Sequence, residues 1–253
     1  MKRWGSEVIV EVEDVIRPEK VDAYKAELNV IRDQLSTIAN NLIIMERLTS
    51  FPYHLFVAED RRVFWSMTNK AFFDATILAF STILAQGGDS LSLRRFKNNV
   101  FNPKGYRLDK IDDEVSEILK QRIDDIDFKR RIQPLQEQIT SVRNNHIAHL
   151  DPRKALSPEA IVSYRLPLET FKQALELSNQ LFQVLGLGVW YQLEFWDYGN
   201  SNQKLDIDEI LEMVAGDSYW FADDPFIDFD EEYQKLSAKD KGIFDEWRKR
   251  VRK

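Results

Sequence analysis

The residues of this chain best suited to chemistry lie together in the stretch Arg143–Asp151, which reads RNNHIAHLD. This stretch holds two of the three histidines in the protein, His146 and His149. Histidine gains and loses a proton near neutral pH, whereas arginine keeps its charge. One permanent cation and two titratable groups in so short a span indicate a site for acid–base chemistry.

The residues upstream predict how these side chains are held. Aliphatic positions four and three residues apart form one face of a helix pointing inward. They are Leu135, Ile139 and Val142. His146 and His149 continue the same spacing, and Arg143 lies one turn before His146. We therefore expect the cation and both imidazoles along one inward-facing edge at the end of a helix.

Length and composition predict a globular protein. With 253 residues, of which 43% are hydrophobic, the chain can bury one large core, or one core and a small appendage. It has no cysteine, which excludes disulfides and any cysteine-ligated metal. Acidic residues interrupt the N-terminal stretch where a signal peptide would be apolar, so we expect a cytoplasmic protein. The apolar run Ala75–Gly87 is shorter than the roughly 20 residues that cross a bilayer, and predicts a core helix instead.

The formal net charge of −7 argues against a protein that coats nucleic acid indiscriminately, because such binding depends on broad phosphate neutralisation. It leaves room for a local site. Basic residues cluster at Arg94–Lys97, Lys104–Lys110, Lys129–Arg131 and the C-terminal WRKRVRK, and acidic residues cluster from Asp223 to Glu232. Taken singly, each run is typical of a solvated face.

Hydrophobic spacing predicts an all-α fold with four long helices. The first is expected at Val21–Met45, the second from near Glu59 to Gly87, the third at Ile111–His149, and the fourth from Leu168 to Gly186 or Gly188. Short connections between them favour an up-and-down four-helix bundle. The second helix is apolar nearly all round from Val63 to Leu84, so it is predicted to be the most buried. Pro134 is expected to kink the third helical region or to restart it.

The remaining elements are shorter. A short helix and a basic turn are expected between Ser90 and Tyr106, and Val8–Val15 alternates as a short strand or an extended lead-in would. We divide the chain into an N-terminal lead-in (1–18), the helical bundle (19–200) and a small C-terminal appendage (201–253). In the appendage, helices are expected at Leu205–Val214 and Ser237–Val251, on either side of an acidic and aromatic stretch.

An arginine, a polar residue and then a histidine, at the end of the third helix of a bundle, resemble the signature of the HEPN superfamily. Here the signature falls on Arg143, Asn144 and His149. The Ala-His-Leu-Asp ending is most similar to the abortive-infection branch of HEPN proteins. The resemblance covers roughly Glu19 to Gly188.

The resemblance implies an endoribonuclease that works without metal or cofactor, as a homodimer with the two signature helices meeting across the interface. Its partners would be RNA and, in microbial defence or a toxin–antitoxin system, an antitoxin or regulatory protein. His149 would be the acid or base for attack of a ribose 2′-OH, Arg143 would hold the phosphoryl oxygens, and Asn144 would position groups by hydrogen bonds. His146 is not the family's histidine by position, and either assists or packs.

Other interpretations stay open. His146, His149 and Asp151 provide two imidazoles and a carboxylate, which suit zinc, but no HExxH arrangement accompanies them. A histidine in an aliphatic stripe is also often a core residue, and a cation at a helix C-terminus is favoured by the helix dipole. A HEPN-like dimeric binding or regulatory module without catalysis is the alternative function, and an ordinary helical scaffold is the third. His54, alone in a proline-containing loop, is assigned no chemistry.

Overall fold

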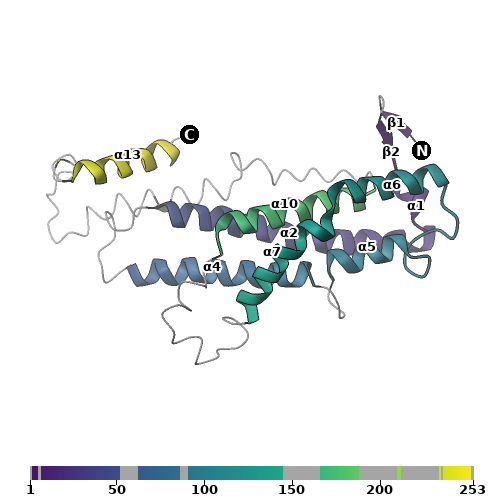
Figure 1. Ribbon diagram of the computed structural model, residues 1–253, viewed down its shortest axis with the longest axis horizontal. Coiled ribbons are helices and arrows are strands. Elements are labelled where there is room, and N and C mark those ends of the chain that lie inside the picture. The colour runs from purple at the N-terminus through teal and green to yellow at the C-terminus, as the bar shows by residue number, and fades with distance from the viewer. Residues whose placement is uncertain are drawn as a thin grey trace. The chain divides into compact units, whose positions relative to one another are not determined.

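The computed structural model of the protein is mostly helical (Figure 1), as the all-α prediction requires. It describes residues 2–4, 7–51, 62–85, 91–144, 166–187, 210–211, 234 and 236–251. Several predicted features lie outside these residues: His54, His146, His149, a helix from Ser157, the aromatic stretch from Val189, and the acidic stretch from Asp223. In the part of the chain that is described, no helix is long and apolar enough to span a membrane.

The chain divides into two compact units. The first consists of Met1–Ala39 and Asp74–Glu194, and the second of Asn40–Phe73 and Phe195–Lys253. Helices α2 (Val21–Ser50) and α4 (Arg62–Ile83) contribute residues to both units. Arg143 and Asn144 belong to the first unit, which is therefore the one that matters for the candidate site.

The N-terminal segment differs from a plain lead-in. Strands β1 (Lys2–Trp4) and β2 (Glu7–Ile9) pair antiparallel, and Val12–Val15 form one helical turn, α1, where a strand or an extended chain was expected. The side chain of Asp14 accepts a 3.1 Å hydrogen bond from the backbone N–H of Glu11, which favours a helix start over the alternating pattern. A short 3-10 helix, η1 (Pro18–Lys20), leads into α2.

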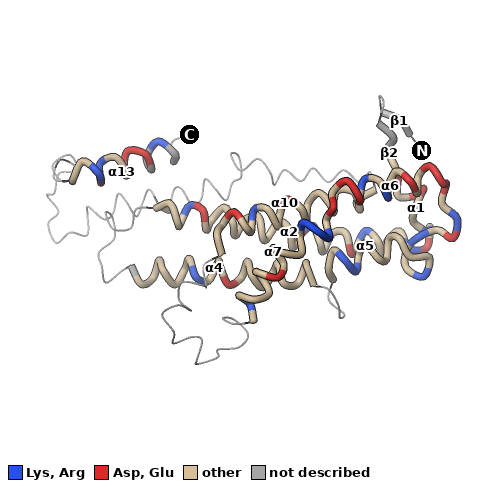
Figure 2. Tube along the Cα trace, viewed as in Figure 1, with Lys and Arg blue, Asp and Glu red and all other residues tan. Residues whose placement is uncertain are grey.

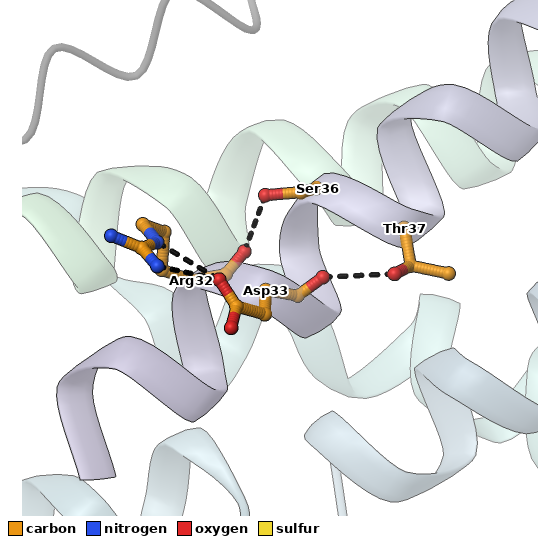
Figure 3. A network of polar contacts seen from close by, with 4 residues as sticks. All are labelled: Arg32, Asp33, Ser36 and Thr37. Carbon is orange, nitrogen blue, oxygen red and sulfur yellow. Dashed lines mark hydrogen bonds and ion pairs between the residues drawn. The ribbon is translucent and has the colours of Figure 1, made fainter. Parts of the chain in front are cut away.

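Helix α2 follows its predicted seam. The seam residues of its first half are at most 2% exposed: Tyr24, Leu28, Ile31, Leu35 and Ile38. The opposite side is polar (Figure 3). There the guanidinium of Arg32 donates to the carboxylate of Asp33 at 2.8 Å, while Thr37 donates to the backbone carbonyl of Asp33. Burial of the seam, at roughly 1.5–3 kcal/mol for each large side chain, holds the helix in place.

Helix α4 is not the most buried helix, contrary to the prediction. Val63, Phe64 and Met67 are 61%, 64% and 66% exposed. Half of the eighteen residues of α10 (Leu168–Leu185) are buried, a larger share than in α4. An apolar surface is buried only where another element covers it, and the sequence of α4 does not specify which side is covered.

The predicted short helix and turn are confirmed. Helix α5 (Leu93–Phe101) begins at Ser92, whose side chain accepts a hydrogen bond from the backbone N–H of Arg95. Leu93, Phe96 and Val100 form its buried side. Helix α13 (Ala238–Val251), in the second unit, agrees with the helix predicted from Ser237.

The third helical region is broken at Asp127, not at Pro134. It consists of α6 (Asp113–Ile126) and α7 (Phe128–Val142), and Figure 1 shows the chain changing direction between them. Asp127 takes a left-handed conformation, with φ 47°, which aspartate tolerates better than most residues. The side chain of Arg131 donates to the Ile126 carbonyl and so caps α6. Pro134 is exposed and lies inside α7.

Candidate active site at the end of helix α7

The inward face of α7 agrees with the sequence prediction at two of its three positions. Ile139 and Val142 are 1% and 6% exposed, whereas Leu135 is only half-buried and Ile132, at 5%, completes the buried face. This stripe packs in the first unit, where α7 contacts α10. The spacing of the stripe sets the rotation of the helix as far as Val142.

A hydrogen bond joins the middle of α7 to the end of α4. The side-chain amide of Gln136 donates to the backbone carbonyl of Leu84, at the end of α4, over 2.6 Å. Gln136 lies seven residues before Arg143, which is about two helical turns. The Gln136 hydrogen bond and the buried aliphatic stripe therefore both hold α7 in position.

Arg143 continues the helical geometry. Its backbone N–H bonds the carbonyls of Ile139 and Thr140, and its φ and ψ are both −52°. Its side chain is exposed, so the prediction that Arg143 lies on an inward-facing edge is wrong. A guanidinium keeps its charge at any ordinary pH and is costly to desolvate without an anionic partner, so an exposed position is the more stable one.

Nothing on α7 neutralises this cation. The residues three and four positions before Arg143 are Thr140 and Ile139, so no acid occupies the neighbouring turn. The carboxylate of Glu137 accepts a 2.9 Å hydrogen bond from Gln133. Among the described residues Arg143 has no ion-pair partner. Within the part of the chain that the structure describes, its charge is therefore not neutralised.

Asn144, the next residue, is exposed as well, so a cation and an amide both face solvent at the helix end. The other predicted site residues, His146 and His149, lie outside the described residues, as does Asp151 of the alternative zinc set. In the described part of the chain, no group of three or more acidic or histidine side chains is placed to hold a metal ion.

Comparison with known proteins places the chain in a family. Residues 21–194 match the model of the HEPN family AbiU2, which is more than half of the chain. The chain belongs to the AbiU2 family of HEPN proteins. No curated protein and no solved structure matches the chain. The AbiU2 match begins where α2 begins and includes α7 with Arg143 and Asn144, which confirms the resemblance to the abortive-infection branch.

The structure also shows a polar cluster that the sequence did not predict in this AbiU2 protein. The carboxylate of Glu27, on α2, lies 3.7 Å from the guanidinium of Arg95 and accepts a 3.3 Å hydrogen bond from Asn99. Burial, followed by hydrogen bonding to Glu27 and the charge of its carboxylate, raises the pKa of Tyr106 to about 12. Glu27 and Asn99 are 72 residues apart, so no local pattern could have indicated the contact.

Proposed function

We propose that this AbiU2-family protein is a metal-independent endoribonuclease whose site contains Arg143, Asn144 and His149. Membership of the family supports the proposal, since the match includes the signature residues. The observation that carries it is the exposure of Arg143 and Asn144 at the end of α7. A guanidinium without an acidic neighbour on its own helix is suited to a phosphodiester from solution.

The proposed reaction is attack of a ribose 2′-OH on the adjacent phosphorus. A base removes the 2′-OH proton, the P–O5′ bond breaks, and an acid protonates the leaving 5′-oxygen. His149 supplies the acid or the base, because an imidazole exchanges protons near neutral pH. Arg143 stabilises charge on the phosphoryl oxygens, and Asn144 orients the phosphate by hydrogen bonding. His146 assists or packs.

The fold expected to carry this chemistry is an up-and-down HEPN-like bundle with a small C-terminal appendage, acting as a homodimer. A two-fold axis beside α7 would bring a second copy of each site residue to the first. Support comes from the exposed side of α7, where spacing of four and three residues lines up polar side chains. They are Gln133, Glu137, Ser141 and Asn144. Such a face fits a hydrated interface between two copies.

The biological setting that goes with the family is microbial defence. We place the protein in the cytoplasm, with RNA as substrate and with an antitoxin or regulatory protein as a further partner. Single-stranded or transfer RNA is the substrate class, because in-line attack requires a linkage that can leave regular helical geometry.

The test is cleavage of RNA by the purified protein in the presence of a metal chelator. The unmodified protein should cut, and Arg143→Ala and His149→Ala should each lower the rate by about 10²-fold or more. Arg130→Gln is the matched control, since Arg130 is an exposed cation on the same helix, with 85% of its side chain accessible. It should cut at the normal rate.

Other results would contradict the proposal. Cleavage that persists in His149→Ala would move the chemistry elsewhere, and cleavage that depends on added metal would exclude the metal-independent reaction. RNA binding by a dimer that never cuts would favour the non-catalytic binding module.

A further inference from the structure

One stretch of the first unit is rich in basic residues and contains no acidic residue. The eighteen residues Leu91–Leu108 contain five basic residues and neither aspartate nor glutamate. The basic ones are Arg94, Arg95, Lys97, Lys104 and Arg107. Figure 2 shows blue, basic segments on α5 and on the loop that follows it. This local excess of positive charge is opposite in sign to the net charge of the chain, which is −7.

The loop after α5 is held rigidly against the helix. The backbone N–H of Tyr106 donates to the Asn99 carbonyl over 2.7 Å, and a guanidinium nitrogen of Arg17 donates to the Gly105 carbonyl over 2.6 Å. Gly105 lies so close to the backbone of Asn99 that any Cβ there would overlap it. The position of Lys104 is therefore fixed relative to α5.

Backbone contacts with the N-terminal segment also hold this loop in place. The backbone N–H of Leu108 donates to the Val15 carbonyl over 2.8 Å, and Ile16 pairs with Arg107 as an isolated β-bridge. Residues 1–20 lie outside the AbiU2 match, so a segment that precedes the family region supports this basic stretch. A rigid surface loses little conformational entropy when it binds a ligand.

Folding accounts for only part of this charge. Arg95 pairs with Glu27, but Arg94, Lys97 and Lys104 have no ion-pair partner within the residues that the structure describes. Arg94 and Arg95 also lie in the first turn of α5, where the helix dipole disfavours cations. The charge of Arg94 therefore does not stabilise its own helix, and it is placed where it attracts an anion.

We propose that Arg94, Lys97 and Lys104, here called the α5 cationic surface, bind the sugar-phosphate backbone of the RNA substrate. This inference rests on the proposed function, and it concerns substrate anchoring, not cleavage. Asn98 and Asn102 are exposed beside the cations and offer amide donors of the kind that contact phosphate and sugar oxygens. Such binding would be largely independent of base sequence, because every nucleotide presents the same backbone.

The test is RNA binding by the full chain with His149→Ala, in chelator, so that cleavage does not interfere. The probe is a fluorescent single-stranded RNA. Adding Arg94→Gln, Lys97→Gln and Lys104→Gln should weaken binding about tenfold or more at about 0.1 M salt. The slope of log affinity against log salt should become shallower by about 2, because each phosphate that a protein neutralises on a single strand adds roughly 0.7 to it.

A matched control removes the same charge elsewhere. Lys120→Gln, Lys129→Gln and Lys239→Gln change exposed lysines on α6, α7 and α13, and this variant should keep near-normal affinity and slope. Equal binding by the two triple variants, both shown by thermal unfolding to be folded, would overturn the inference.

The inference and the proposed function can fail separately. In the cleaving protein, the α5 triple variant should raise KM with little change in kcat. If the unmodified protein binds RNA through the α5 cationic surface but never cuts it, the inference stands and the nuclease proposal falls. If the protein cuts RNA and the α5 triple variant binds normally, the nuclease proposal stands and the inference falls.

Discussion

The phenol of Tyr24 donates a 2.8 Å hydrogen bond to the backbone carbonyl of Leu185, across 161 residues of chain. The bond joins the first turns of α2 to the last turn of α10. The ring of Tyr24 also stacks on Phe96, with centroids 5.5 Å apart, and meets Tyr106 edge to face at 6.3 Å. One buried side chain therefore ties together α2, α5, α10 and the loop of the α5 cationic surface.

Removing the Tyr24 hydroxyl should destabilise the protein measurably. In Tyr24→Phe the buried carbonyl of Leu185 loses its donor, and the expected loss in free energy of unfolding is about 1–3 kcal/mol. Urea denaturation followed by circular dichroism measures it. Thr37→Val is the control, because the Thr37 hydroxyl bonds the Asp33 carbonyl at an exposed position and its loss should cost less than about 0.5 kcal/mol.

Two glycines should respond to alanine in opposite directions. Gly105→Ala places a Cβ against the Asn99 backbone, so we expect about 1–3 kcal/mol of destabilisation and weaker RNA binding. Gly242 lies within helix α13 with nothing near its Cβ position. Gly242→Ala should raise stability by about 0.5–1 kcal/mol. A comparison of thermal unfolding temperatures decides, and a stable Gly105→Ala protein would show that the loop can move.

The sequence predicted elements well where one pattern repeats without interruption. The seam of α2 is three and four residues apart over many turns, and only one helix rotation buries it. Helix α4 is apolar on several sides, so its sequence predicted a helix but not that Phe64 would be exposed. The break at Asp127 was missed because Pro134 is the stronger sequence signal, although a proline on an exposed side is accommodated within α7.

The candidate site was predictable only in its local part. Arg143 and Asn144 stand at the helix end expected for them, yet Arg143 faces solvent although it follows the buried Ile139 by one turn. Spacing alone could not predict this, because a guanidinium is costly to bury without an anionic partner. Whether two copies of α7 meet remains a prediction. The contact between Glu27 and Arg95 brings distant segments together, and neither residue signals it locally.

The raised pKa of Tyr106 predicts that the protein loses stability at alkaline pH. Its pKa is raised from 10.0 to about 12 in the folded protein, so folding favours the neutral phenol. This contribution is complete below pH 10.0 and is lost as the pH rises through about 12. The free energy of unfolding of Tyr106→Phe should therefore fall less steeply over this window than that of the unmodified protein. Parallel declines in urea denaturation would show that the Tyr106 phenol does not contribute.

The left-handed conformation of Asp127 should restrict what this position accepts. Asp127→Val places a β-branched residue at φ 47° and should cost about 1–2 kcal/mol. Asp127→Gly removes the steric penalty and gives up only the exposed ion pair with Arg130, so stability should stay within about 0.5 kcal/mol. Asp125→Val, at an exposed position of α6 with ordinary helical geometry, is the control and should cost well under 1 kcal/mol, about the difference in helix propensity.

Replacing Arg143 by lysine should separate charge from geometry in the proposed site. Lysine keeps one positive charge but loses the planar fork that holds two phosphoryl oxygens together. If Arg143 acts on the transition state, Arg143→Lys should lower kcat by roughly 10–100-fold with little change in KM, and Arg143→Ala should lower it further. Single-turnover cleavage of a short RNA measures the chemical step. A rise in KM at unchanged kcat would instead assign Arg143 to substrate binding, because the interaction would then be equally strong before and during the reaction.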